Sequence, residues 1–134
     1  MINELCKQAH ATQVEKGFVE EGKPRNFGEC IALVHSELSE ALEGSREGCE
    51  EPSFGQKFAI EREIDEIKFR FSFSTIEPTP IYDMYKKSPG FELADAVIRI
   101  FGMVEEHGIE DFEWYIITKM AYNSKRPFKH GKKY

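Results

Sequence analysis

Residues 91–104 read FELADAVIRIFGMV, and this stretch decides the fold. Projected at about 100° per residue, its apolar side chains cover most of the circumference of a helix. The one narrow polar stripe, continued past residue 104, consists of Glu92, Asp95, Arg99 and Glu106, with Gly102 among them. A helix that is apolar nearly all round is a buried helix. We therefore expect a central helix over about 91–107, closed by Gly108.

Other segments indicate further helices. Apolar residues recur at helical spacing over 2–16 and 27–43, and a last helix is expected over about 111–122 with Asp111 as its cap. Asn26 is a good N-cap for the second helix, and Gly44 marks its expected end. A fifth helix is expected over 57–68.

The segment between residues 46 and 89 looks irregular. Phe69, Phe71 and Phe73 alternate with polar residues, which predicts a short extended piece, and Pro78, Pro80 and Pro89 predict a loop. The sequence therefore predicts an all-α bundle of about four to five helices with an irregular insert at about 46–89. A chain of 134 residues fits one domain, here 1–134.

Composition excludes several classes of protein. No apolar run approaches the roughly 18 residues of a membrane span. The N-terminus lacks the pattern of a signal peptide, so we expect a cytoplasmic protein with no membrane association. The three cysteines, Cys6, Cys30 and Cys49, form no CxxC pair, so neither a disulfide framework nor a cysteine zinc site is indicated.

Charge is unevenly distributed along the chain. The first 118 residues hold twelve of the eighteen Lys and Arg residues and all twenty-four Asp and Glu residues, a net charge of −12. The remaining six basic residues follow from Lys119 onward with no acidic residue among them. Duplex nucleic acid is not an expected partner, because binding it requires a broad basic face. The basic tail suits a few phosphates, or is a solvated terminus.

Two of the expected helices each offer an acidic pair at i, i+3: Glu37 with Glu40, and Glu92 with Asp95. Residues three apart are neighbours on a helix surface, and like charges there repel. Four carboxylates facing one another in a bundle would bind a hard divalent cation such as Mg²⁺. The alternative is that each pair is solvated surface. A ferritin-like di-iron site is excluded, because none of the four histidines completes a Glu-x-x-His motif.

The last expected helix carries Lys119, Asn123 and Arg126 at i, i+4 and i+7, which would place them on one face. Lysine and arginine are phosphate donors, and asparagine adds a neutral donor. A carboxylate metal site beside such a row suits a polyphosphate bridged by Mg²⁺.

Three motifs in this order resemble the MazG-like all-α nucleoside triphosphate pyrophosphohydrolases. They are Ser36-Glu37-Leu38-Ser39-Glu40-Ala41-Leu42-Glu43, then Glu92-Leu93-Ala94-Asp95 through Ile100, then Lys119-x-x-x-Asn123-x-x-Arg126-Pro127-Phe128-Lys129-His130-Gly131-Lys132. The segment from His10 through Val14-Glu15-Lys16-Gly17-Phe18 is similar to small single-domain members. The resemblance covers about residues 1–44 and 90–134.

The resemblance implies Mg²⁺-dependent hydrolysis, with Mn²⁺ as a possible substitute, of a nucleoside triphosphate to the monophosphate and pyrophosphate, in nucleotide-pool house-cleaning or control. By motif match, Glu37, Glu40, Glu92 and Asp95 would hold the metal, with Glu37 or Glu40 as the base. Lys119, Asn123 and Arg126 would bind phosphates, and His10, Phe18 and Asn26 are candidates for contacting the nucleoside. A homodimer or homotetramer is implied, and the nearly all-apolar helix independently agrees with it.

The long spacer between Glu40 and Glu92 departs from a compact member and leaves open what the insert does and which nucleotide is the substrate. A different class also remains: a non-catalytic helical module that binds a partner or senses a nucleotide. That alternative explains the acidic body and the aromatic residues, but it leaves the paired acids and the phosphate row as coincidence.

Overall fold

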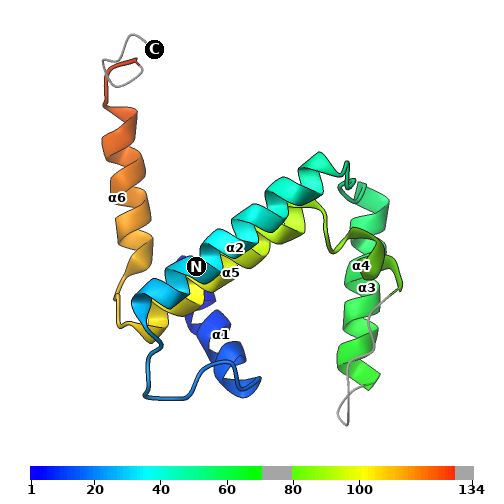
Figure 1. Ribbon diagram of the computed structural model, residues 1–134, viewed down its shortest axis with the longest axis horizontal. Helices are drawn as coiled ribbons and strands as arrows, with labels where there is room; N and C mark the ends of the chain where they lie inside the picture. The colour runs from blue at the N-terminus through cyan, green and yellow to red at the C-terminus, as the bar shows by residue number, and fades with distance from the viewer. Residues whose placement is uncertain (71–79, 129–134) are drawn as a thin grey trace. The chain divides into compact units, whose positions relative to one another are not determined.

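The computed structural model describes residues 1–70 and 80–128, and it describes the side chains of all of these except residues 65–70 and 80. This part of the chain forms six α-helices and no strand, so the predicted all-α class is confirmed (Figure 1). The helices are α1 (Ile2–Glu15), α2 (Phe27–Arg46), α3 (Phe54–Arg70), α4 (Pro80–Tyr85), α5 (Pro89–Glu106) and α6 (Phe112–Ser124).

The chain divides into two compact units. One comprises Met1–Cys30 and Ile98–Tyr134, and the other comprises Ile31–Val97. Helices α2 and α5 each contribute one end to each unit. The Ile31–Val97 unit therefore holds most of α2, the start of α5, and the two insert helices α3 and α4.

In the unit of residues 1–30 and 98–134, the start of α1 contacts the start of α6. The Glu113 carboxylate accepts hydrogen bonds from the amino group of Met1 at 3.0 Å and the backbone N–H of Ile2 at 3.1 Å. Asp111 occupies the N-cap position of α6 as predicted, but its side chain does not cap the helix. It accepts a hydrogen bond from Asn3 instead, at 3.0 Å.

Helix α2 begins as predicted and ends later than predicted. The Asn26 side-chain oxygen accepts hydrogen bonds from the backbone N–H groups of Gly28 and Glu29, at 2.8 and 3.3 Å. The helix then continues through Gly44 to Arg46. Gly44 is a packing position rather than a C-cap, because the carbonyl oxygen of Lys87 occupies the space where a Cβ would lie.

The insert is more regular than predicted. Helix α3 runs through Phe69 and Arg70, so the extended piece predicted there is wrong at those two residues, while Phe71 and Phe73 lie outside the described residues. Pro80 and Pro89 are the first residues of α4 and α5 rather than parts of a loop. Proline is tolerated at a first helical position because the N–H it lacks would have no partner there.

The buried face of α2 includes only Val34 and Ala41 of the main apolar stripe of this helix, which consists of Phe27, Ile31, Val34, Leu38, Ala41 and Leu42. In the Ile31–Val97 unit, α2 buries Val34, Glu37, Ala41 and Gly44. The apolar side chains of Ile31, Leu38 and Leu42 remain 37–51% exposed. Among the described residues, the more apolar face of α2 is therefore left partly exposed, while the buried face includes a carboxylate.

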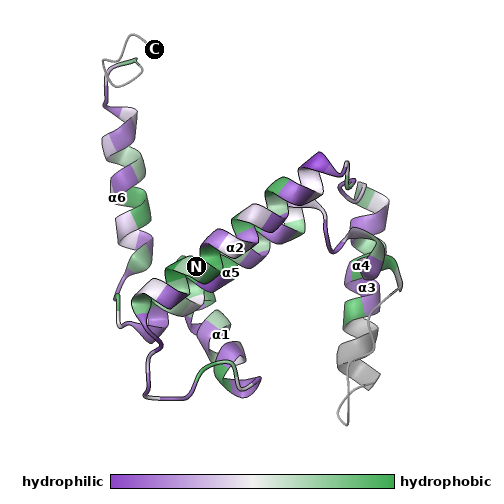
Figure 2. Cartoon of the chain, viewed as in Figure 1, coloured by the Kyte–Doolittle hydropathy of each residue, from purple (hydrophilic) through white to green (hydrophobic). Residues whose placement is uncertain are grey.

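Helix α5 is likewise not buried all round within one chain. Ala96, Met103 and Val104 are buried, while Leu93, Val97 and Ile98 are 43–49% exposed. Figure 2 shows the hydrophobic residues along this helix and along α6.

The close approach at Gly44 generates a prediction. Gly44→Ala should destabilise the protein by about 1–2 kcal/mol, because overpacking costs roughly 1–3 kcal/mol and the better helix propensity of alanine offsets up to about 1 kcal/mol. Urea denaturation followed by circular dichroism would measure it.

The matched control is Gly55→Ala in α3, where an added Cβ meets no atom within 4 Å. This variant should be neutral or stabilised by up to about 1 kcal/mol. Equal effects of the two substitutions would contradict the packing role of Gly44.

Candidate functional site

Three of the four predicted metal ligands converge in the Ile31–Val97 unit. Glu37 and Glu40 project from α2 and Glu92 from α5, and one carboxylate oxygen of each lies within 4.8 Å of the others. Glu37 and Glu92 are only 7% and 8% exposed, whereas Glu40 is exposed. The i, i+3 spacing on α2 and the approach of the start of α5 to α2, which is also seen between Lys87 and Gly44, together produce this cluster.

The negative charges of these carboxylates repel one another. The pKa of Glu92 is raised, first by burial and then by the negative charges of Glu40, Asp95 and Glu37. Burial and neighbouring like charge both disfavour the ionised form. A cation bound beside Glu92 would offset both effects.

Asp95, the fourth predicted ligand, lies outside the group of three. It follows Glu92 by one turn of α5 and is exposed. Its charge nevertheless raises the pKa of both Glu92 and Tyr82. Asp95 is thus near enough to influence the cluster but is not gathered into it.

The insert brings two further side chains to this cluster that sequence reasoning missed. Tyr82 of α4 has its pKa raised by burial and by Asp95 and Glu92. Lys87, which precedes α5, lines a small cavity of about 90 Å³ together with Glu40, Glu43, Gly44, Glu47 and Glu92. The sequence signal for Lys87 was a basic residue just before the acidic pair of α5. Because a loop is predicted at that position, the sequence did not connect this lysine with the cluster.

The donor set fits a hard divalent cation. All three converging groups are carboxylates, the ligand type that Mg²⁺ and Mn²⁺ share. Two are buried and mutually repelling, so a cation would remove an unfavourable interaction as well as form favourable ones. Glu40, at the exposed side, leaves the cluster accessible to water and to a ligand.

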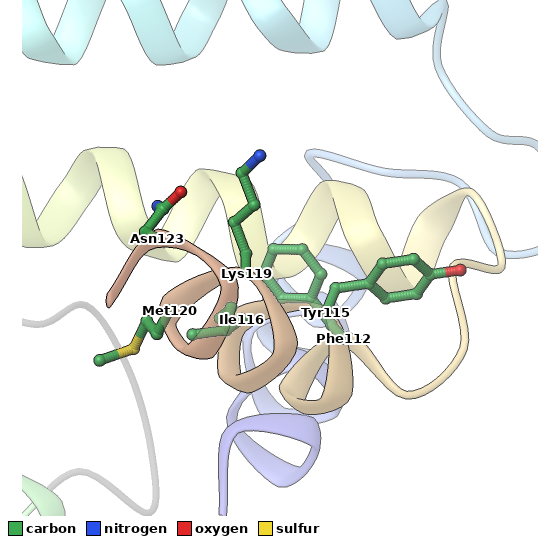
Figure 3. A pocket seen from close by; sticks show the side chains of 6 residues that line it. All are labelled: Phe112, Tyr115, Ile116, Lys119, Met120 and Asn123. Atoms are coloured by element: carbon green, nitrogen blue, oxygen red, sulfur yellow. The ribbon is translucent and has the colours of Figure 1, made fainter. Parts of the chain in front are cut away.

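The predicted phosphate-binding residues lie in the other unit. Lys119 and Asn123 project from the same side of α6 and border an open apolar pocket of about 440 Å³ with Phe112, Tyr115, Ile116 and Met120 (Figure 3). The Lys119 ammonium lies 5.4 Å from the centre of the Tyr122 ring. Arg126 is not on the helix face as predicted, because α6 ends at Ser124. It follows in a turn in which its N–H donates to the Asn123 carbonyl at 3.2 Å.

The nucleoside-contact candidates occupy the same unit as α6. His10 is partly buried on α1, and its Nδ1 has no partner among the described residues. Phe18 is 74% exposed after α1, so it is not a core residue of the chain. Asn26 caps α2 as described.

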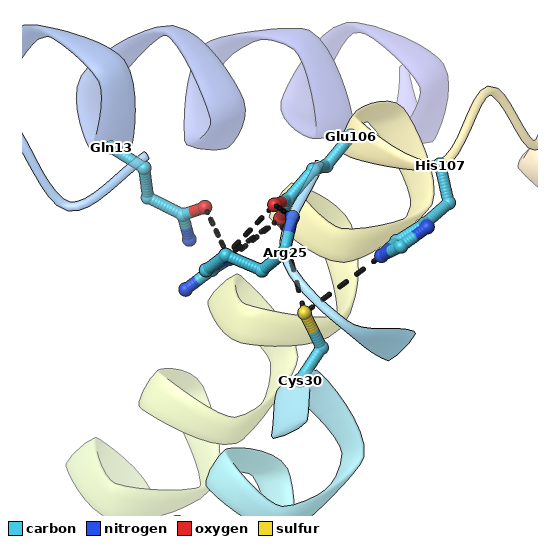
Figure 4. A network of polar contacts seen from close by, with 5 residues as sticks. All are labelled: Gln13, Arg25, Cys30, Glu106 and His107. Atoms are coloured by element: carbon cyan, nitrogen blue, oxygen red, sulfur yellow. Dashed lines mark hydrogen bonds and ion pairs between the residues drawn. The ribbon is translucent and has the colours of Figure 1, made fainter. Parts of the chain in front are cut away.

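A second group with possible metal ligands is built differently. Cys30, Glu106 and His107 lie together, with the Cys30 sulfur 3.9 Å from both a Glu106 oxygen and His107 Nε2 (Figure 4). Arg25 donates hydrogen bonds to both Glu106 carboxylate oxygens. Its Nε and Nη2 lie 3.1 and 2.7 Å from Oε2. This partner lowers the pKa of Glu106, while burial raises the pKa of the Cys30 thiol. The carboxylate already has its cation, so this group is a structural network.

None of the described helices combines the length and the apolar character needed to cross a membrane. Comparisons of the chain with models of known protein families, with characterised proteins and with solved structures found no match. The resemblance to MazG-like enzymes therefore rests on the motifs themselves.

The repulsion within the cluster predicts an unusual pair of effects for Glu92→Gln. Without divalent ions the variant should be more stable than the parent, with Tm higher by roughly 2–5 °C, the shift that about 1 kcal/mol produces in a domain of this size. Adding Mg²⁺ should stabilise the parent, because a ligand that binds only the folded state raises Tm. The variant should lose most of that response.

Differential scanning fluorimetry in EDTA and in millimolar Mg²⁺ would measure both effects. Glu61→Gln, at an exposed carboxylate of α3, is the control and should behave like the parent. A Glu92→Gln protein that is less stable in EDTA and still responds fully to Mg²⁺ would contradict the interpretation of the cluster.

Proposed function

We propose that the protein is a Mg²⁺-dependent nucleoside triphosphate pyrophosphohydrolase, which converts a ribo- or deoxyribonucleoside triphosphate and water to the monophosphate and pyrophosphate. The observation that carries the proposal is the convergence of Glu37, Glu40 and Glu92 from two helices, with two of the three buried. The motifs shared with MazG-like enzymes supply the choice of reaction.

Bound Mg²⁺, or Mn²⁺ in its place, would neutralise phosphate oxygens and lower the pKa of an attacking water. Glu37 and Glu92, buried and opposed across α2 and α5, are suited to holding the ion, and Asp95 to supporting it from the next turn. Ionic ligands fixed in a partly buried site act mainly by positioning and electrostatic stabilisation, as in phosphoryl transfer generally.

Glu40 is the better of the two candidate bases. A general base must reach the water whose proton it accepts. Glu40 is exposed, while Glu37 lies on the buried face of α2. Ser36 donates a hydrogen bond of 3.5 Å to the Glu40 carboxylate, which helps to orient it. The proton would pass from water to Glu40, and pyrophosphate would leave with its charge met by the cation. Lys119, Asn123 and Arg126 keep the phosphate-binding role that the resemblance to MazG-like enzymes implies.

The active form proposed here is a homodimer or homotetramer. Within the Ile31–Val97 unit, Ile31, Leu38 and Leu42 of α2 and Leu93 and Val97 of α5 are all exposed. In the other unit, α6 exposes Trp114, Ile117 and Met120. Exposed apolar residues in such number are typical of a surface that another protein covers. A second copy would complete the core that the apolar pattern of α5 demands.

The activity is tested by incubating the protein with a panel of nucleoside triphosphates in Mg²⁺ and in EDTA and separating the products. Glu37→Gln should fold as the parent does and lose at least about 99% of turnover, because removing one group that stabilises developing charge commonly costs about 10²–10³ in rate. Glu61→Gln should retain normal turnover.

Each product pattern has a distinct meaning. Monophosphate and pyrophosphate in Mg²⁺ alone would support the proposal. Diphosphate and orthophosphate would show that a different bond is cleaved. No product from a folded protein that responds to Mg²⁺ would favour the nucleotide-sensing module. A Glu37→Gln protein that kept most of its turnover would contradict the metal assignment.

The proposed assembly predicts that Leu38→Glu converts the oligomer to monomers, because a charge buried against apolar side chains of a partner is strongly unfavourable. Leu38 is 43% exposed in one chain, so the helical circular dichroism should not change. Light scattering after size exclusion would measure the mass. Thr12→Glu, at an exposed polar position of α1, is the control. A parent protein that is monomeric at micromolar concentration would rule the assembly out.

A further inference from the structure

We propose that Lys87, contributed by the insert, is the residue at the carboxylate cluster that receives the pyrophosphate portion of the substrate. This inference rests on the proposed function and assigns a role to a residue that the shared motifs do not contain. It makes the insert part of the substrate site rather than a peripheral loop.

The backbone beside Lys87 is firmly held. Its carbonyl oxygen packs against α2 at Gly44, where no Cβ intervenes. The next residue, Ser88, is only 1% exposed, and its N–H donates to the Tyr85 carbonyl at 2.8 Å. Glu51 accepts a hydrogen bond of 2.6 Å from the N–H of Gly90. These contacts tie the turn before α5 to its surroundings, and the Lys87 side chain extends from a fixed point.

Charge around the cavity makes Lys87 distinctive. The residues that line it include four carboxylates, those of Glu40, Glu43, Glu47 and Glu92, and Lys87 is the cation among them. Its charge opposes the rise in the pKa of Glu92. Yet Lys87 is exposed and forms no ion pair with any described residue, whereas neighbouring Lys86 pairs with Asp83 at 2.9 Å.

This arrangement gives Lys87 opposite effects on the two ligands of the site. A positive charge beside the cluster repels Mg²⁺, so for the metal alone Lys87 is unfavourable. Glu43 and Glu47 would repel a polyphosphate that approached the metal, and the uncommitted ammonium offsets that repulsion and can donate to phosphate oxygens. A residue that merely supported the fold would not affect the two ligands in opposite directions.

The experiment compares Lys87→Gln, Lys87→Arg and Lys86→Gln by isothermal titration calorimetry, first with Mg²⁺ alone and then with inorganic pyrophosphate at saturating Mg²⁺. Lys87→Gln should bind Mg²⁺ about two- to fivefold more tightly, as expected for one nearby charge in a solvated site. It should bind pyrophosphate about tenfold more weakly, as expected for the loss of one charge-assisted hydrogen bond. Lys87→Arg should retain most pyrophosphate affinity, and Lys86→Gln should change neither affinity by more than about twofold.

The outcomes separate this inference from the proposed function. Suppose that Lys87→Gln weakens the binding of both Mg²⁺ and pyrophosphate, or of neither, while the parent protein hydrolyses triphosphates. The Lys87 assignment is then wrong and the proposed function stands. If Lys86→Gln produces the same pair of changes, the effect is general surface charge and the assignment is again wrong. If the parent protein binds neither Mg²⁺ nor Mg²⁺-pyrophosphate, both proposals are wrong.

Discussion

The repulsion among carboxylates held between α2 and α5 is the constraint on which the rest of the structure depends. Glu37 and Glu92 occupy buried positions that an apolar side chain would fill at lower cost. The turn before α5 closes against α2 at Gly44 and keeps the two helices close enough for this repulsion to matter. A bound cation would relieve this repulsion, and a hard divalent ion is the kind that three carboxylate oxygens would favour.

Much of this site could be predicted from the sequence because its parts are local. The spacing of Glu37 and Glu40, and the acidic residues on the otherwise apolar helix of Glu92, follow from helical periodicity alone. The features that could not be predicted depend on tertiary contacts. Gly44 ends a helix by the usual rule, but here it admits the backbone of Lys87. The prolines at residues 80 and 89 predicted a loop, but proline is equally well tolerated at the first position of a helix, which is where both residues lie.

The apolar pattern of α2 predicts the helix correctly but does not identify which of its apolar residues one chain buries. Its main apolar stripe includes Ile31, Leu38 and Leu42, and these side chains are exposed in a single chain. Periodicity reports that a face must be covered, but it does not report which chain covers it. The same limit applies to α6, whose row of Lys119 and Asn123 is helical as predicted, while Arg126 lies in the turn beyond. Sequence spacing predicted the shared helix face of Lys119 and Asn123. Arg126 does not lie on that face because α6 ends at Ser124.

The most direct test of the central claim is anomalous diffraction from crystals soaked in Mn²⁺, recorded near the manganese edge. The account predicts a strong peak bounded by the carboxylates of Glu37, Glu40 and Glu92, with oxygens at about 2.2 Å from the metal, near the distances of other divalent ions bound by oxygen. A peak at another position would contradict the account. The absence of any peak, with protons shared among the three carboxyl groups in place of a metal, would also contradict it.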